Sequence, residues 1–228
     1  METIARTTDQ TLATLASLPI RASKEGESLK LLPAEPPRKP CETSWQKKWL
    51  KLNCHHPKIQ TMADRAEAFC GRWYRFSPTP ALLVLVGEPN CGKTHTARAI
   101  YQFARSTAFQ AFVAGKGKTW GKRISALEFM RWPEIVDDFK NGNYGTVNDM
   151  IDTDLLVLDD VGAEHDPSKS AASKLCQILS RRERKFTVLT SNVPPTQWPE
   201  RFDTRIADRL IRNSEVIDLF GVPSYATL

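Results

Sequence analysis

A glycine-rich loop between an apolar run and a helical stretch limits the possible folds of this chain more than any other feature. Residues 87–94 have the spacing G-x-x-x-x-G-K-T, directly after the apolar run 81–86 and before the helical stretch TARAIYQFAR. In that setting successive backbone N–H groups point inward and the positive end of a helix lies beside them, which favours a phosphate group. The pattern predicts a phosphate-binding loop in an α/β fold.

Each residue of this loop is a candidate contact to a bound nucleotide, and these residues are Gly87, Glu88, Pro89, Asn90, Cys91, Gly92, Lys93, Thr94 and His95. Lys93 is expected to bridge the β- and γ-phosphates, and Thr94 to offer its hydroxyl to Mg²⁺. Asn90 stands where the commonest loops have another glycine. Because Asn is the non-glycine residue that best tolerates a positive φ, we expect the loop to close. Cys91 is interpreted as a tolerated small residue.

Two acids end a second apolar run, in the segment LLVLDD at residues 155–160. A buried parallel strand delivers such residues to the carboxyl edge of a sheet, where ligands bind in open α/β folds. We expect Asp159 to hold Mg²⁺, mostly through water, and Asp160 to orient or deprotonate the attacking water. The alternative is that the two acids form a helix cap or a simple turn.

The next apolar run, FTVLTSN at residues 186–192, ends in small polar residues. Its end should lie at the same edge of the sheet, so Thr190 or Asn192 is a candidate contact to the γ-phosphate or the attacking water. No N-K-x-D sequence, the usual guanine-specific reader, occurs in the chain. ATP is therefore the expected nucleotide.

Apolar runs alternate with helical stretches from residue 81 onward, which is typical of a parallel α/β sheet. We expect five strands within the runs 81–86, 112–127, 154–160, 186–192 and 215–220. Helices are expected at 93–107, 131–141, 168–183 and 203–212. The predicted fold is an α/β core with a parallel five-stranded sheet between helices.

The chain before the loop divides into two further segments. Residues 1–43 are polar and end in a proline-rich stretch, so we expect a flexible arm that could bind a partner, with a short helix near Thr11–Leu18. Residues 44–80 form a helical lead-in with an amphipathic segment at Met62–Trp73. Residues 81–228 form the predicted ATPase domain, and because the chain stops at Leu228 we expect no sizeable C-terminal lid.

The chain lacks features of membrane or secreted proteins. Its longest apolar run, Ala81 to Val86, is far shorter than a membrane span, and no secretory signal begins the sequence. The five cysteines are odd in number and scattered, which argues against a disulfide framework and matches no zinc-binding pair. We expect a cytoplasmic protein.

Basic residues gather in two segments of a chain whose net charge is +6. Residues 41–80 carry seven Lys or Arg against three acids. The loop 115–123 carries one aromatic residue among four cations, and its candidate DNA contacts are Lys116, Lys118, Trp120, Lys122 and Arg123. The alternatives are a solvated basic surface and a surface turn with a half-buried tryptophan.

Three arginines follow one another at helical spacing in FDTRIADRLIRN, at positions 205, 209 and 212. Arginines so far along the chain from the loop suit a role in trans, in which one subunit offers a guanidinium to its neighbour's nucleotide. The alternative is an exposed basic helix face with Asp203 and Asp208 as partners.

The order of these elements resembles AAA+ ATPases of the DnaC/IstB family, which includes DnaC-type helicase loaders. The resemblance runs from about Gln60 to Tyr225 and rests on GEPNCGKTHTARAI, DLLVLDDVGAE, SKSAASKLCQILSRRERK, FTVLTSN, RIADRL and the closing PSY. It implies that Lys93 and Thr94 are Walker A residues and that Asp159 and Asp160 are the Walker B pair. It also implies Asn192 as sensor 1, and Arg205, with Arg209 as second candidate, as the arginine finger. Family members often carry an arginine where Ala226 stands.

This resemblance implies an oligomeric ATPase that binds single-stranded DNA and delivers a replicative helicase. One alternative is an IstB-like transposition ATPase that acts with a transposase. Another is a switch or adaptor that binds ATP but hydrolyses little, which Asp160 in place of the commoner Glu keeps open.

Overall fold

A five-stranded parallel sheet forms the centre of the protein in a computed structural model that describes residues 43–52, 56–77, 79–116, 120, 122–123, 126–166, 170–212 and 214–224. The strand order is β2-β3-β4-β1-β5. The strands are β1 (Leu82–Val86), β2 (Leu127–Arg131), β3 (Leu155–Val161), β4 (Phe186–Ser191) and β5 (Ser214–Asp218). Every neighbouring pair is parallel, which confirms the predicted fold class.

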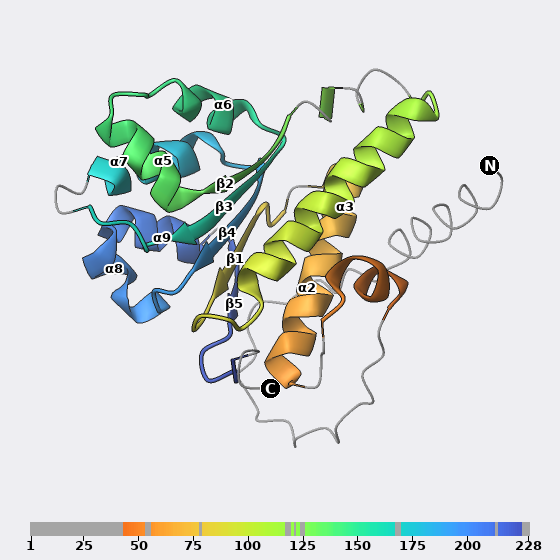
Figure 1. Cartoon of the computed structure of the whole chain (residues 1–228), viewed down its shortest axis with the longest axis horizontal. Helices are drawn as coiled ribbons and strands as arrows, with labels where there is room; N and C mark the ends of the chain where they lie inside the picture. The colour runs from red at the N-terminus through yellow and green to blue at the C-terminus, as the bar shows by residue number, and fades with distance from the viewer. Residues whose placement is uncertain are drawn as a thin grey trace.

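The sheet is apolar on both faces because helices cover both (Figure 1). In β1, Leu83 and Leu85 pack into one apolar core, whereas Val84 and Val86 pack into the other. Buried strands of this kind read as continuous apolar runs rather than as alternating ones. The run LLVLV is β1 and the run LLVLDDV is β3. Together with β4 they are the three central strands of the sheet.

One face of the sheet is covered by two long helices, α2 (Pro57–Tyr74) and α3 (Lys93–Val113), which lie side by side (Figure 1). The π-helical turn η1 (Gln46–Leu50) packs against both. Helix α2 begins with proline at its first position, and the ring of His56 accepts a hydrogen bond from the Lys58 N–H at 3.2 Å. These contacts stop the first turn from fraying.

An aromatic cluster joins the lead-in helices to α3. The Phe103 ring of α3 meets Trp45, Trp49 and Trp73 edge-on, with ring centroids 5.8 to 6.4 Å apart. Phe103, Trp45 and Trp73 are almost completely buried. The segment before the loop therefore shares one core with the sheet.

Shorter helices cover the other face of the sheet (Figure 1). They are α5 (Trp132–Lys140), α6 (Thr146–Asp152), α7 (Ser170–Arg181), the 3₁₀ turn η2 (Pro195–Gln197), α8 (Trp198–Arg201) and α9 (Thr204–Arg212). Helix α7 packs between α6 and α9. The Asp166 carboxylate accepts from the backbone N–H groups of Ser170 and Ala171, so α7 begins with a carboxylate at its positive end.

Two sequence expectations were wrong in detail. The second strand was expected within 112–127, but Phe112 and Val113 continue α3 and the strand lies at Leu127–Arg131. This strand is at the sheet edge and only partly buried, so its apolar signal is weak. Helix α6 was not expected, although Val147, Met150 and Ile151 are buried at helical spacing.

The predicted arm, residues 1–43, lies outside the described residues except for Thr43. The expected helix at Thr11–Leu18 is in that part. Within the described segments, none of the helices combines the length and the apolar character that crossing a membrane requires.

Phe103→Ala is expected to lower the free energy of unfolding by about 3–5 kcal/mol, because it opens a cavity among three tryptophans. Phe109→Ala on the same helix is the matched control, since Phe109 is 59% exposed and its loss should cost less than about 0.5 kcal/mol. Urea denaturation measures both values. Equal losses in the two variants would contradict the assignment of this cluster to the core.

Candidate nucleotide-binding site

The loop between β1 and α3 has a backbone that only certain residues can adopt. Gly87 lies so close to the chain after β5 that an added Cβ would be 2.7 Å from the Leu219 Cβ. Asn90 has φ of 61°, which confirms that an asparagine takes the left-handed conformation expected here. The helix begins at Lys93, and the Cys91 side chain is buried beneath the loop.

The Lys93 side chain folds back over its own loop. Its Nζ donates to the Gly87 carbonyl at 2.9 Å and to the Glu88 carbonyl at 2.7 Å, and the residue is 5% exposed. The Cys91 Sγ lies 3.6 Å from the same nitrogen, and none of these three partners is a carboxylate. A phosphate entering the loop would therefore gain a charge-assisted hydrogen bond.

The Asp159 carboxylate connects three elements of the site. Its Oδ1 accepts from the Thr94 hydroxyl at 2.9 Å and from the Thr190 hydroxyl at 2.6 Å. Thr94 belongs to α3 and Thr190 to β4, so the loop helix and two strands meet at one oxygen atom. Thr94 and Asp159 supply neighbouring hard oxygen donors, which is the donor type that Mg²⁺ prefers.

The backbone of β3 is irregular at Asp160, the residue after Asp159. The pairing of β3 with β4 shifts register between Leu158 and Val161, and Asp160 has φ of 60°. Bulges of this type re-aim side chains near active sites. The Asp160 N–H donates to the Thr190 hydroxyl at 2.9 Å, and its carboxylate lies 3.6 Å from Arg131 Nη2 at the end of β2.

A cavity of about 750 Å³ opens beside these residues. Eight of the lining residues were expected from the sequence, and they are Pro89, Asn90, Gly92, Lys93, Thr94, His95, Asp160 and Asn192. Asp159 is buried below, at 1% exposed. The structure therefore brings together the loop, the second acid and the polar end of β4, although they lie about a hundred residues apart in the chain.

The sequence expectations missed several residues of this site. Leu52 and Arg98 also line the cavity. Leu52 follows η1, and the η1 carbonyl of Leu50 is hydrogen-bonded to the His95 ring. The lead-in therefore forms part of the cavity wall, which no periodicity could have indicated. Arg98 was predictable in principle, because it lies one helical turn after Thr94.

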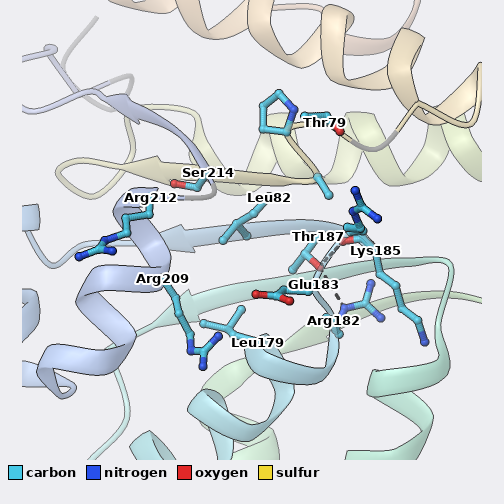
Figure 2. A pocket seen from close by; sticks show the side chains of 13 residues that line it. Thr79, Leu82, Leu179, Arg182, Glu183, Lys185, Thr187, Arg209, Arg212 and Ser214 are labelled. Atoms are coloured by element: carbon cyan, nitrogen blue, oxygen red, sulfur yellow. Dashed lines mark hydrogen bonds between the residues drawn. The ribbon is translucent and has the colours of Figure 1, made fainter.

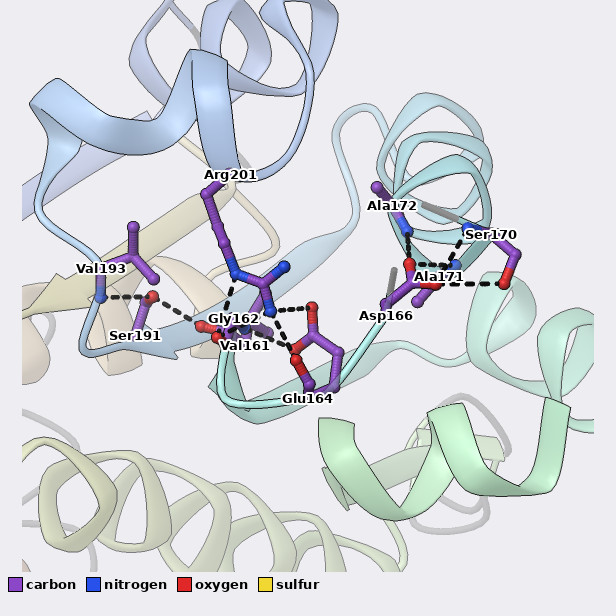
Figure 3. Close-up of polar contacts among 10 residues, drawn as sticks. All are labelled: Val161, Gly162, Glu164, Asp166, Ser170, Ala171, Ala172, Ser191, Val193 and Arg201. Atoms are coloured by element: carbon purple, nitrogen blue, oxygen red, sulfur yellow. Dashed lines mark hydrogen bonds and ion pairs between the residues drawn. The ribbon is translucent and has the colours of Figure 1, made fainter. Parts of the chain in front are cut away.

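A polar cluster lies just after β3 and β4, the two strands that carry Asp160 and precede Asn192 (Figure 3). The Arg201 guanidinium of α8 donates to the Gly162 carbonyl at 2.9 Å and to the Glu164 carbonyl at 2.6 Å. The Glu164 carboxylate accepts from the Gly162 N–H at 2.8 Å. A Cβ at Gly162, where φ is 94°, would lie 2.6 Å from the Val193 side chain, so only glycine fits there. This cluster joins the ends of β3 and β4 to α8.

Neither candidate finger reaches the cavity of its own chain. Arg205 is on the exposed side of α9, where its guanidinium donates to the Asp203 carboxylate at 3.0 Å. That ion pair raises the pKa of Arg205. Arg209 lines a different cavity at the amino edge of the sheet. Helix α9 runs back toward the start of β5, so one turn of about 5.4 Å separates these two arginines along the sheet.

Two of the candidate DNA contacts are buried, which corrects the expectation for them. Trp120 is 9% exposed and packs against Trp73, Tyr74 and Phe76. Arg123 is 4% exposed and donates to the Asp154 carboxylate at 2.7 Å, and burial lowers its pKa. Trp120 and Arg123 therefore take part in packing within the protein, where the Arg123 guanidinium lies over the rings of Trp73 and Phe76.

The other candidates of that loop have different positions. Lys116 and Lys122 are exposed. Lys118 lies outside the described residues. The exposed lysines alone carry no aromatic surface for stacking with a base.

A profile of the IstB-like ATP-binding proteins matches residues 72–225, which is more than half of the chain. The chain belongs to this family. The match includes the loop, both acids, Asn192 and the arginine-bearing helix α9. No curated protein sequence matched this IstB-like chain significantly.

Solved structures share its fold. The crystal structure of the DnaC helicase loader has 17% identical residues and a TM-score of 0.56, over 76% of this chain and 97% of that one. The crystal structure of DnaI has 20% identity and a TM-score of 0.56, over 75% and 93%. Domain III of the Thermotoga maritima replication initiation protein DnaA has 18% identity and a TM-score of 0.51, over 75% and 65%. The IstB-like protein therefore has the AAA+ fold.

Asn90→Ala is expected to weaken ATP binding about fivefold, because an alanine lets the free loop relax from a left-handed backbone that binding must then restore at a cost of about 1 kcal/mol. Asn90→Gly, the matched control, should bind within about twofold of the wild type, since glycine adopts positive φ freely. Titration with a fluorescent ATP analogue measures both. If alanine binds as tightly as glycine, the backbone of residue 90 does not limit the loop.

Proposed function

We propose that this IstB-like protein hydrolyses ATP with Mg²⁺ as an oligomer, binds single-stranded DNA and delivers a replicative helicase. The observation that carries the hydrolytic part is the convergence of Lys93, Thr94 and Asp159 beside a cavity that Asp160 and Asn192 also line. A site that only bound nucleotide would have no need of a second acid directed into the cavity.

The binding half of the site is the loop and its lysine. Backbone N–H groups of residues 90–94 would hold the β-phosphate, while Lys93 would leave its two carbonyl partners to bridge the β- and γ-phosphates. Thr94 and Asp159 would hold Mg²⁺, which when bound neutralises charge on the phosphates. The hydrogen bond between Thr94 and Asp159 keeps both donors in position.

The reacting half is Asp160 with Asn192. In phosphoryl transfer the protein mainly positions the nucleophile and stabilises charge, so the roles are geometric. Asp160 would orient a water against the γ-phosphate and accept its proton, and Asn192 would hold that water or a γ-oxygen. The lack of an N-K-x-D sequence supports ATP over GTP.

Asp160→Asn is expected to lower ATP turnover by at least about 100-fold, because an amide cannot accept the proton of the water, while ATP affinity stays within a few-fold. Asp137→Asn is the matched control, since the Asp137 carboxylate lies on the exposed side of α5. Phosphate release and ATP titration measure the two quantities. Wild-type turnover in Asp160→Asn would contradict this role.

The same assay separates hydrolysis from a passive switch. Turnover of the wild type is measured with and without single-stranded DNA. Turnover that DNA stimulates supports the proposed motor. A protein that binds ATP but turns over at the rate of Asp160→Asn in both conditions is the switch instead, and the proximity of Arg131 to Asp160 gives that candidate a structural basis.

Arg205 is proposed to act in trans. Its side chain is 72% exposed and does not line the nucleotide cavity of its own subunit. Its guanidinium could therefore meet a γ-phosphate only in a neighbouring subunit. Release from Asp203 would come before that contact. This proposal requires an oligomer in which α9 of one subunit faces the loop of the next.

A mixture of Arg205→Ala and Asp160→Asn subunits is expected to regain part of the turnover that each variant lacks alone. Activity returns at interfaces where an intact Asp160 meets an intact Arg205 of the neighbour. Phosphate release from the mixed oligomer measures the recovery. The control is the Arg205→Ala protein alone at the same total concentration. No recovery in an oligomer of unchanged size would assign Arg205 a role within its own subunit or none.

The client is proposed to be a replicative helicase, bound through residues 1–43 ahead of the lead-in and the ATPase domain. The DnaC and DnaI folds favour this candidate, and the IstB-like family match favours a transposase as the second candidate. Pull-downs with purified helicase and purified transposase, with and without ATP, separate them. ATP-dependent retention of the transposase alone would replace the first candidate by the second.

A further inference from the structure

A second cavity, of about 450 Å³, opens at the amino edge of the sheet (Figure 2), whereas the nucleotide cavity lies at the carboxyl edge. Its walls come from the starts of β1, β4 and β5, the end of α7 with the following turn, and the end of α9. The lining residues are Thr79, Pro80, Ala81, Leu82, Leu179, Arg182, Glu183, Arg184, Lys185, Thr187, Arg209, Arg212 and Ser214. None of them contributes to the nucleotide cavity.

This cavity is strongly basic. Five of its lining residues are Arg or Lys, and Glu183 is the one acid among them. Lys185 and Arg212 are partly neutralised by Asp152 and Asp208. Within the described part of the chain, the guanidinium groups of Arg184 and Arg209 form no ion pair and no hydrogen bond. Two guanidinium groups are therefore available to an anion.

The floor of the cavity also carries a positive charge. Arg182 is 3% exposed, and its guanidinium donates only to neutral oxygens, which include the Met150, Thr153 and Phe186 carbonyls and the Thr187 hydroxyl. Loss of water lowers the pKa of Arg182 to about 10. The nearby Asp154 and Asp152 carboxylates offset part of this charge without contacting it, and the remaining positive charge favours an anion at the cavity.

Arg184 has a strained backbone conformation. In the turn between α7 and β4 this residue has φ of 65°, a conformation that glycine adopts far more readily. An arginine at such a position is unusual for a turn that only reverses the chain. Its side chain stays exposed at the rim of the cavity.

The chemistry of the lining favours a nucleotide over an acidic peptide. Guanidinium groups match the oxygens of a phosphodiester, and Pro80, Leu82 and Leu179 provide an apolar surface for a sugar or base. The Glu183 carboxylate repels any anion placed against it, but it can accept a hydrogen bond from a base amino group, which the acidic side chains of a peptide cannot donate.

We propose that this amino-edge cavity binds a single-stranded nucleic acid, with the phosphodiester on Arg184 and Arg209 and the adjoining sugar or base on the apolar surface of Pro80, Leu82 and Leu179. This inference rests on the proposed function only in its DNA-binding part. It places the strand at the edge of the sheet opposite the nucleotide, where Arg184 and Lys185 also line a neighbouring pocket with Arg123.

The test is fluorescence anisotropy with a labelled oligodeoxycytidine of about 20 nucleotides. Arg184→Glu is expected to weaken binding roughly tenfold and to reduce the salt dependence, because an attraction to phosphate becomes a repulsion. Arg105→Glu is the matched control, since Arg105 is exposed on α3 and far from the cavity lining. It should bind within about twofold of the wild type.

Arg184→Gly separates binding from folding. Glycine suits the positive φ of this turn, so the variant should unfold at the same or a higher temperature while still binding the oligonucleotide more weakly. Wild-type binding by both Arg184 variants would overturn the location. If unlabelled poly-glutamate displaces the oligonucleotide as well as unlabelled oligodeoxycytidine does, the cavity takes acidic peptides and the proposal fails.

Two further results separate a failure of the proposed function from a failure of the cavity proposal. Absence of oligonucleotide binding by the wild type would overturn both the cavity proposal and the DNA-binding part of the proposed function. Wild-type binding without ATP turnover would overturn the hydrolytic part and leave the cavity proposal intact.

Discussion

The Asp159 carboxylate is the point on which the arrangement of the nucleotide site depends. It is buried, and its Oδ1 accepts from hydroxyl groups of α3 and β4. A buried carboxylate without such partners would be strongly destabilising, so α3, β3 and β4 must keep their relative positions. The site is therefore preformed, and a nucleotide would bind to donor groups that are already in position.

Asp160 illustrates how a small irregularity makes two neighbouring acids different. Without the register shift in β3, consecutive side chains would point to opposite faces of the sheet, and the second acid would enter an apolar core. The bulge and the left-handed backbone instead leave Asp160 half-buried at the cavity. Asp159 is held below the loop by two hydroxyl groups, whereas Asp160 lines the cavity with only Arg131 beside its carboxylate in the described residues.

Arginines serve opposite purposes at different places in this fold. Arg123, Arg182 and Arg201 are held by carbonyls, carboxylates and rings, and they join segments far apart in the chain. Arg184 and Arg205 are exposed instead. Spacing in the sequence cannot separate these classes, because burial depends on which elements pack together. For this reason the loop 115–123 resembled a DNA contact, although its tryptophan and Arg123 belong to the core.

The sequence by itself determined the class of fold and the chemistry of the carboxyl edge. The continuous apolar runs allow only strands covered on both faces, and their order with the loop, Asp159, Asp160 and the polar end of β4 leads these groups to one edge. Such local patterns are readable because each depends on neighbours in the chain. Even the positive φ of Asn90 followed from the residue type.

Only the tertiary structure decided which residue of β4 contacts Asp159. It also decided that Leu52 and Arg98 line the nucleotide cavity, and which arginines are buried or exposed. These features depend on packing between segments, such as the Trp45 and Phe103 contact that brings the lead-in to α3. The basic cavity at the amino edge is of the same kind. Its cations come from the turn after α7 and from α9, and the parallel sheet gathers them because each crossover returns the chain to that edge.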